Sequence, residues 1–266
     1  MSIIYAIFLG LIQGLTEFLP VSSSGHLAIA QHFLPGFSQP GLLFDVLLHA
    51  ATMAAVVLYF RRDLLALLRA CLPGGNSVDR RLLLMLVLAS VPTAIIGLAM
   101  KDAVEQLFDN MLVVGAMLLV TGVLLTIAGR VQKIGRPLAA LTRRDALLVG
   151  VAQGFAVLPG ISRSGATIGC LLLRGIDAAA AARFSFLLAL PAVGGAALLQ
   201  LKDLNQVTAA EIPAYLAGSL VAFISGILAI RLLLGVLQRR RLGVFALYCL
   251  VLGTLVIAAS LFVPGA

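Results

Sequence analysis

The sequence predicts an all-α polytopic membrane protein with an inverted-topology repeat, in which each half is a re-entrant helix hairpin followed by three transmembrane helices. Composition is the first observation: 61% of the 266 residues are hydrophobic and 11% are charged, and the mean hydropathy is +1.11. Soluble domains are about 45–50% apolar and about 25% charged. An internal duplication and an uneven distribution of positive charge then predict how the helices are arranged.

The duplication relates residues 9–27, LGLIQGLTEFLPVSSSGHL, to residues 149–167, VGVAQGFAVLPGISRSGAT, at an offset of 140. We therefore expect one integral membrane domain over residues 1–266, with repeat one at about 1–129 and repeat two at about 145–263. The pairs that coincide at this offset are Gly10 with Gly150, Gln13 with Gln153, Gly14 with Gly154, Ser22 with Ser162, Ser24 with Ser164, Gly25 with Gly165, Phe44 with Phe184 and Asp63 with Asp203.

Repeat one begins with two short apolar pieces, 3–19 and 25–34, separated by Pro20 and a run of serines. Neither piece comfortably crosses about 30 Å of hydrocarbon at a rise of about 1.5 Å per residue. We predict two half-helices of a re-entrant hairpin with the loop PVSSSG at its tip, enclosed by protein because non-helical backbone is not tolerated against lipid. Three full spans are expected after it, at about 42–60, 82–100 and 111–129.

Repeat two has the same order, with a broken pair at about 145–159 and 164–174 and spans at about 183–201, 212–236 and 242–263. Each repeat crosses the membrane an odd number of times, so the second copy is upside down relative to the first. The two hairpins are therefore expected to enter from opposite faces and to meet near the midplane. Many transporters build a central site in this way, so the architecture alone does not identify an enzyme.

Positive charge predicts the orientation. Segments 101–110 and 202–211 hold one cation each, and Arg163 lies in the second hairpin. The other sixteen of the nineteen Lys and Arg residues lie in four segments that we assign to the cytoplasm, 61–81, 130–144, 174–183 and 231–241. The positive-inside rule then places both termini outside. Because these loops account for the net charge of +8, we expect no nucleic acid partner.

The three cysteines, Cys71, Cys170 and Cys249, are isolated in the sequence. Neither a disulfide framework nor a zinc site is expected from such spacing. The apolar N-terminus lacks a basic region and a small-residue cleavage site, so we do not expect a removable signal peptide.

Glu17 is the first candidate for chemistry, because a lone carboxylate in an apolar membrane segment is costly unless something needs it. Gln13 lies one helical turn earlier and faces the same way. Together they offer oxygen ligands to a hard divalent cation, with phosphate oxygens completing its shell. The structural alternative is a carboxylate that is hydrogen-bonded to backbone at the hairpin tip.

Serines precede the second half-helix of each hairpin: Ser22, Ser23 and Ser24 in repeat one, and Ser162 and Ser164 in repeat two. N-capping alone would explain them. Two opposed half-helix starts would also direct free N–H groups and positive dipole ends at one point, which is an anion-binding arrangement.

Two histidines carry open alternatives. His26 lies in the first turn after the serines, where it is either a general base or nucleophile or only a hydrogen-bonded polar group. His49 shares a helix face with Asp45, and the two are either a supporting pair for the site or an interhelical polar clamp. His32 is expected near the membrane surface and is given no role.

Arg163 is a guanidinium at membrane depth and therefore needs an anionic partner. Its planar fork suits phosphate oxygens. The alternative is a salt bridge to Glu17, which would still place both residues in one site. Thr167 lies one helical turn later and is expected to add a hydroxyl to that site.

These motifs resemble those of the undecaprenyl-diphosphate phosphatase family, also known as the bacitracin-resistance proteins. Gln13-x-x-x-Glu17 with FLPVSSSGH is similar to the family's (E/Q)xxxE element, and PGISRSGAT at 159–167 is similar to its PGxSRSxxT element. The resemblance implies hydrolysis of undecaprenyl (polyprenyl) diphosphate to the monophosphate and inorganic phosphate at the outer face of the bacterial inner (cytoplasmic) membrane. That reaction would recycle the lipid carrier for cell-wall synthesis and confer bacitracin resistance.

The resemblance also implies residue roles. Glu17 with Gln13 would hold a divalent cation, Mg²⁺ or Ca²⁺, and Glu17, Ser23, His26 and Arg163 would be the catalytic residues. Gln13 stands where many members carry glutamate, which removes a charge from the cation site. Whether Ser23, His26 or water is the nucleophile stays open. The residues expected to bind the diphosphate are Ser22, Ser24, Ser162, Arg163, Ser164 and Thr167.

Two other functions remain open. A secondary transporter or lipid-carrier flippase would share the inverted repeats and would move its substrate without releasing phosphate. An acid-phosphatase-type lipid phosphatase would use the Ser-Gly-His sequence, but it needs a further histidine and none follows His49. The expected partners are a polyprenyl diphosphate lipid and membrane lipid, and a homodimer is one oligomeric state to test.

The orientation predicts a labelling pattern in a background that lacks the native cysteines. Ser38→Cys should react with an impermeant thiol reagent added outside intact cells, whereas Ser77→Cys should not. The opposite pattern would overturn the orientation, and reaction at both positions would contradict the number of spans.

Overall fold

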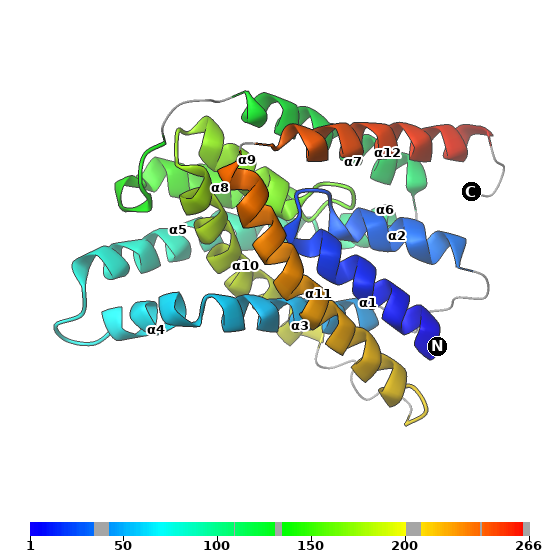
Figure 1. Cartoon of the computed structure of the whole chain (residues 1–266), viewed down its shortest axis with the longest axis horizontal. Coiled ribbons are helices and arrows are strands. Elements are labelled where there is room, and N and C mark those ends of the chain that lie inside the picture. Colours follow the sequence, from blue (N-terminus) through cyan, green and yellow to red (C-terminus); the bar gives the residue numbers. More distant parts are fainter. Residues whose placement is uncertain (35–42, 109, 131–134, 201–208, 240, 263–266) are drawn as a thin grey trace.

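The computed structural model describes residues 1–34, 43–108, 110–130, 135–200, 209–239 and 241–262, and the regular elements in these ranges are helices (Figure 1). Repeat one contains α1 (Ile3–Phe18), α2 (Ser23–Phe33), α3 (Leu43–Tyr59), α4 (Arg61–Ala70), α5 (Ser77–Ala99), α6 (Lys101–Leu107) and α7 (Met111–Gly129). After the 3₁₀ turn η1 (Leu138–Ala140), repeat two contains α8 (Arg143–Phe155), α9 (Arg163–Leu173), α10 (Ala178–Gln200), α11 (Ile212–Gln238) and α12 (Gly243–Phe262). Ser38, the position chosen for external labelling, lies outside the described residues.

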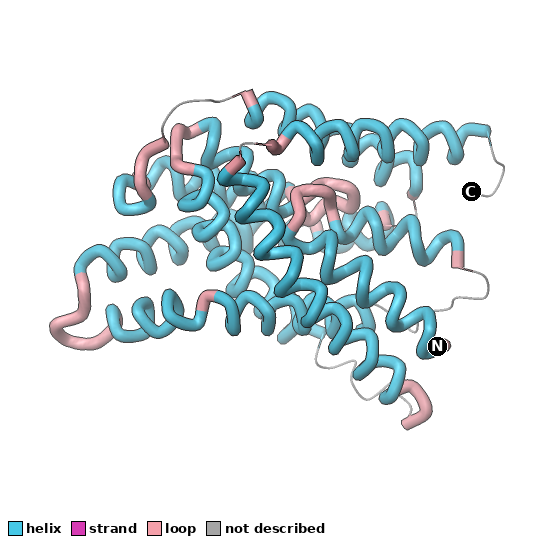
Figure 2. Tube along the Cα trace, viewed as in Figure 1, coloured by secondary structure: helices cyan, strands magenta, loops and turns pink. Residues whose placement is uncertain are grey.

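Both predicted hairpins are present, as the helix pairs α1–α2 and α8–α9. Figure 2 shows their connecting loops meeting at the centre of the molecule. The tips touch directly, because the Ser164 hydroxyl donates a 3.0 Å hydrogen bond to the Leu19 carbonyl. A Cβ added to Gly25 would lie 3.1 Å from the Gly160 Cα. The two hairpins therefore form one central structure.

The predicted full spans are also present. Five helices, α5, α7, α10, α11 and α12, are long and apolar enough to cross a membrane by length and composition, and α3 with α4 makes a sixth if the bent pair counts as one span. The hairpin helices α1 and α9 are too short for this test. The fold class is therefore confirmed as a polytopic helical membrane protein.

Three boundaries differ from the sequence prediction. The segment 61–81, predicted as a loop, contains α4, which is bent by 77° from α3 and buries Leu67 and Ala70. α5 begins at Ser77 because the Asn76 side chain caps its first turn. α10 begins at Ala178 because the Asp177 carboxylate accepts the N–H groups of residues 179 and 180.

Duplicated glycines explain how the hairpins pack. A Cβ on Gly10 would collide with the Gly218 carbonyl of α11, and one on Gly150 would collide with the Ala89 carbonyl of α5. Because glycine has no Cβ, the backbones approach closely at both crossings. α1 therefore packs on α11 and α8 packs on α5, so each hairpin lies against a span of the other half. The inverted orientation and the division into two repeats stay predictions.

A buried carboxylate joins the two legs of the second hairpin at its base. The Asp145 side chain has no exposed surface and accepts bonds from Arg174 Nε at 2.7 Å and Arg136 Nη2 at 3.1 Å. It also closes a capping box with Thr142 at the start of α8. Arg136 donates further to the Arg174 carbonyl at 2.8 Å, which ties the loop before α8 to the end of α9.

The charge on Asp145 should matter for stability. Burial opposes ionisation, but the hydrogen bonds from Arg174, Thr142 and Arg136 outweigh it and lower the pKa of the carboxyl to about 2. Because this pKa lies below the ordinary value of 3.8, the stabilisation is present above pH 3.8 and is lost as the pH falls toward 2.

Asp145→Asn should accordingly lower the unfolding free energy by about 1.5–3 kcal/mol, the usual value for hydrogen bonds to a charged group. Thermal unfolding of the purified protein in detergent measures the loss. Asp102→Asn, at an exposed residue of α6, is the matched control and should unfold like the parent. Equal unfolding of all three proteins near neutral pH would show that Asp145 does not stabilise the hairpin.

Candidate active site

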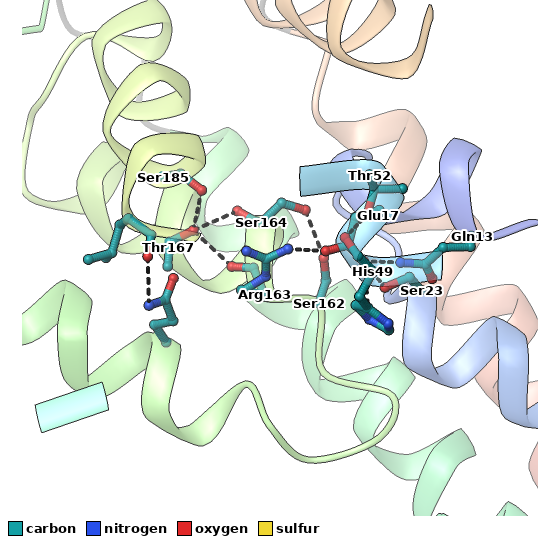
Figure 3. Close-up of polar contacts among 12 residues, drawn as sticks. Gln13, Glu17, Ser23, His49, Thr52, Ser162, Arg163, Ser164, Thr167 and Ser185 are labelled. Carbon is teal, nitrogen blue, oxygen red and sulfur yellow. Dashed lines mark hydrogen bonds and ion pairs between the residues drawn. The ribbon is translucent and has the colours of Figure 1, made fainter. Parts of the chain in front are cut away.

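The site is centred on Glu17, which is 4% exposed and lies in the last turn of α1 (Figure 3). Its Oε1 atom forms an ion pair with Nη2 of Arg163, the first residue of α9. Its Oε2 atom accepts hydrogen bonds from Ser23 Oγ at 2.5 Å and from Gln13 Nε2 at 2.9 Å. The carboxylate therefore joins the tips of both hairpins.

Ser23 and Arg163 occupy corresponding positions, because the offset of 140 relates them. Each is the first residue of the second helix of its hairpin. Each bonds a different oxygen of Glu17. The duplicated scaffold thus presents a hydroxyl and a guanidinium to one carboxylate from two sides.

The serines cap both helices in the same way. The Ser22 hydroxyl accepts from the Gly25 N–H at 3.2 Å, and the Ser162 hydroxyl accepts from the Gly165 N–H at 3.0 Å. The N–H groups at the start of a helix have no partner within it, and they carry the positive end of its dipole. The two helix starts converge beside Glu17, as expected, since Ser23 and Arg163 both bond its carboxylate; anion binding at this point stays a prediction.

The cap of α2 is held in a strained conformation. Ser22 has a φ of 70° and is the only described non-glycine residue with a positive φ, a conformation that costs energy for residues other than glycine. Ser24 lies 3.3 Å from the Ser22 hydroxyl, and the same 162–164 pair in repeat two is separated by 3.2 Å. The strain falls on the residue beside the candidate nucleophile.

His26 is hydrogen-bonded on both sides, and neither partner is Glu17 or Ser23. Its Nδ1 donates to the Ser22 carbonyl at 2.7 Å, and its Nε2 lies 2.6 Å from the Tyr248 hydroxyl. Since a carbonyl only accepts, Nε2 of the neutral ring is the acceptor and the phenol is the donor. The two rings also stack, with centroids 5.6 Å apart. Tyr248 lies 222 positions from His26, in α12 and outside both motifs, so the sequence did not indicate it.

Thr167 does not point at Glu17. Its hydroxyl donates to the Arg163 carbonyl at 2.8 Å and lies 2.6 Å from the Ser185 hydroxyl of α10. The Thr167 side chain has no exposed surface. In this structure Thr167 bonds the first turn of α9 and links it to α10. Ser185 is a second residue, after Tyr248, that the motifs did not indicate.

His49 lies beside the site, whereas the Asp45 side chain bonds a residue of α2, so the two side chains do not act as one pair. Its Nε2 is 3.6 Å from Glu17 Oε2, and its Nδ1 donates to the Asp45 backbone carbonyl at 2.7 Å. The buried Thr52 donates to the His49 carbonyl at 2.8 Å. The Asp45 carboxylate accepts instead from Gln31 at 2.8 Å, so the interaction of Asp45 with His49 is through the backbone. His32 is exposed in the last turn of α2.

The residues fit a cation that takes oxygen ligands. In the described chain no group of three or more His, Cys, Asp and Glu could hold a metal ion. However, the Gln13 Oε1 atom is buried and has no hydrogen-bond partner among the described residues, and it lies on the amide that bonds Glu17. Hard divalent cations prefer such carboxylate, amide and hydroxyl oxygens and take the remainder from water or phosphate.

The comparisons agree with the motifs. The family model described as Bacitracin resistance protein BacA matches residues 6–255. A protein from Syntrophotalea carbinolica named undecaprenyl-diphosphatase is 56% identical, over 98% of this chain and 100% of its own length. Proteins of the same name from Desulfosudis oleivorans and Halothermothrix orenii are 46% and 42% identical, over 95% and 97% of this chain and 97% and 98% of their own.

The resemblance inferred from the two motifs is thereby confirmed over nearly the whole chain. The chain belongs to the bacitracin resistance protein BacA family.

Proposed function

We propose that this protein hydrolyses undecaprenyl, or another polyprenyl, diphosphate to the monophosphate and inorganic phosphate. The observation that carries this proposal is the Glu17–Arg163 ion pair at the point where two helix N-termini converge. Phosphoryl transfer depends mainly on positioning and on neutralising charge on the transferred oxygens. A guanidinium and two helix ends supply that neutralisation. The substrate is inferred from the name of the relatives, undecaprenyl-diphosphatase.

Arg163 and the helix starts would bind the diphosphate. Only one N–H of Arg163 bonds another side chain in the described residues, so the rest of its fork is free to bond phosphate oxygens. The side chain is 19% exposed, which leaves a face for the substrate. We assign to the same binding site the hydroxyls that cap these helix starts or lie beside the caps, those of Ser22, Ser24, Ser162 and Ser164.

Ser23 is the nucleophile that the geometry favours. Its hydroxyl already donates to Glu17 at 2.5 Å, so its oxygen can attack the terminal phosphorus while Glu17 accepts the proton. The Ser23–phosphorus bond forms as the phosphoanhydride bond breaks, and polyprenyl monophosphate leaves. Because the leaving group is itself a phosphate, no strong general acid is needed.

Water would then release the phosphate from Ser23. The water oxygen attacks phosphorus, the bond to Ser23 breaks, and the proton held by Glu17 returns to the serine oxygen. His26 lies one turn after Ser23 on the same face of α2, and we assign to its Nε2 the proton that the water loses. In this structure the Tyr248 hydroxyl bonds Nε2. The proton from water therefore either passes through that hydroxyl or reaches Nε2 after the hydroxyl has moved away.

Gln13 and Glu17 would hold the divalent cation, Mg²⁺ or Ca²⁺. The unpaired Gln13 Oε1 atom supports this assignment. When bound, the cation would add positive charge beside the diphosphate oxygens. Glutamine in place of glutamate at position 13 leaves the site with one carboxylate, so we expect weaker cation binding than with two.

The location of the reaction is part of the proposal. The cluster of Lys and Arg in the segments assigned to the cytoplasm favours a multi-pass protein with both termini outside, and the family resemblance implies the bacterial inner membrane and a site that opens to the outside. There, hydrolysis would recycle the lipid carrier for cell-wall synthesis and confer bacitracin resistance. A site between membrane helices allows the polyprenyl chain to remain in lipid while the diphosphate reaches Glu17.

Phosphate release by the purified protein tests the function. We expect inorganic phosphate from a polyprenyl diphosphate, loss of that activity with EDTA, and recovery with Mg²⁺ or Ca²⁺. Movement of the lipid across vesicles without phosphate release would support a transporter instead, and activity indifferent to EDTA would remove the cation from the proposal.

The nucleophile can be identified with substrate labelled in the terminal phosphate. His26→Gln should slow the second step, so labelled protein should accumulate, and its label should survive acid but be lost in base, as a serine ester is. Ser23→Ala should carry no label. An acid-labile, base-stable label that forms on the parent and on Ser23→Ala, and is absent from His26→Gln, would instead identify His26 as the nucleophile.

Arg163→Lys separates a diphosphate-binding residue from a structural ion pair. Lysine keeps the charge but not the planar fork. Losing one charge-assisted contact is worth roughly 1.5–3 kcal/mol, or about tenfold to more than a hundredfold in rate. We expect the loss in kcat as well as in KM, with unchanged thermal stability. Full activity in Arg163→Lys, together with an unstable Arg163→Ala, would show that Arg163 is only structural.

A further inference from the structure

A buried threonine of α7 bonds both backbone groups of the turn that precedes Arg163. The Thr121 hydroxyl donates to the Gly160 carbonyl at 3.0 Å and accepts from the Ser162 N–H at 3.0 Å. Thr121 is 1% exposed. Gly160 has a φ of 97°, a conformation that glycine takes without steric cost.

This turn determines where the second hairpin delivers its side chains. Ser162 is the N-cap of α9 and Arg163 is its first residue, so a shift of the turn moves both. The Gly160 carbonyl and the Ser162 N–H precede the helix and cannot be satisfied by it. Buried backbone groups need a partner, and the Thr121 hydroxyl satisfies both at once.

The other hairpin has a matching contact. Cys249 of α12 has no exposed surface, and its thiol bonds the Pro20 carbonyl at 3.7 Å. Pro20 corresponds to Gly160 at the offset of 140. α7 and α12 are the last spans of their halves and pack against each other. Each tip is thus held at the same carbonyl by the last helix of the other half, strongly by a hydroxyl and weakly by a thiol.

We propose that Thr121 is a positioning residue of the active site, whose hydroxyl holds the 160–162 turn so that Arg163 meets Glu17 and the diphosphate. The inference rests on the proposed function. It goes beyond both sequence motifs, because Thr121 lies in neither.

Three variants test the contact. Thr121→Val keeps the shape but removes the hydroxyl, and kcat/KM for a polyprenyl diphosphate should fall about 10- to 100-fold, as for a small misplacement of a catalytic group. Thr121→Ser keeps the hydroxyl and should stay within about threefold. Thr126→Val is the matched control, since among the described residues the Thr126 hydroxyl bonds only the Gly122 carbonyl of its own helix, and it should behave like the parent.

A double-mutant cycle distinguishes positioning from general destabilisation. If Thr121 acts through Arg163, Thr121→Val should cost little further activity in an Arg163→Ala background, because the two effects are then coupled. Fully additive losses would overturn the proposal. So would a Thr121→Val enzyme with parental kcat/KM.

Hydrogen–deuterium exchange reads the contact without activity. The peptide containing the Ser162 amide should exchange slowly in the parent and in Thr121→Ser, and faster in Thr121→Val. Unchanged protection in Thr121→Val would refute the proposed role of Thr121 in holding the 160–162 turn, even if the enzyme lost activity. A parent that releases no phosphate would refute the proposed function, while the exchange result would still decide the role of Thr121.

Discussion

The ion pair between Glu17 and Arg163 is the constraint on which the rest of the structure depends. It joins the tips of two hairpins that come from different halves of the chain. Without the Arg163 guanidinium, the buried Glu17 carboxylate would be an uncompensated charge in an apolar surrounding, which is strongly destabilising. These two groups are brought together inside the protein by the two helix starts, their serine caps and the close glycine contacts. There the backbone groups of the loops also find hydrogen-bond partners.

The two halves of the chain carry different residues at the positions that meet at the site. At the offset of 140, the position of Glu17 is Val157 in repeat two, and the position of Ser23 is Arg163. The scaffold supplies two equivalent places beside one point, and the sequence fills them with a hydroxyl and a guanidinium. A symmetric arrangement would suit moving a ligand between two faces, whereas this asymmetric set has a hydroxyl on one side of the carboxylate and a guanidinium on the other.

Much of this arrangement could be predicted from sequence because the informative residues are local. Glu17, Ser23 and Arg163 lie within two short motifs, and the hairpins follow from apolar pieces too short to span a membrane. The residues that sequence reasoning missed act across the fold: Tyr248 bonds His26, and Thr121 bonds the turn before Arg163. Neither has a signal in its own surroundings, since both lie in apolar helices that read as ordinary spans.

The direction in which a side chain points and the exact ends of the helices were equally hard to predict. Thr167 follows Arg163 by one turn, so spacing places it near the site, yet its hydroxyl turns to its own helix and to Ser185. Spacing along a helix determines the face on which a residue lies but not the hydrogen-bond partner of its hydroxyl. A threonine in a helix readily donates to the carbonyl one turn back. Charged residues in the short segment 61–81 predict a loop, whereas the structure has the helix α4, which buries Leu67 on one face and exposes Leu68 on another.

Gln13 and Gln153 show what the scaffold needs and what the site adds. Both are buried, both keep an Oε1 atom without a partner in the described residues, and they correspond at the offset of 140. Gln153 is followed one turn later by Val157 and not by a carboxylate, and its amide donates to Thr93 and to the Leu188 carbonyl, joining three helices. Glutamine at this position therefore has a structural use that is independent of any cation. The proposed cation role of Gln13 arises only because Glu17 stands one turn later, where repeat two has Val157, so the carboxylate rather than the amide separates the active hairpin from its copy.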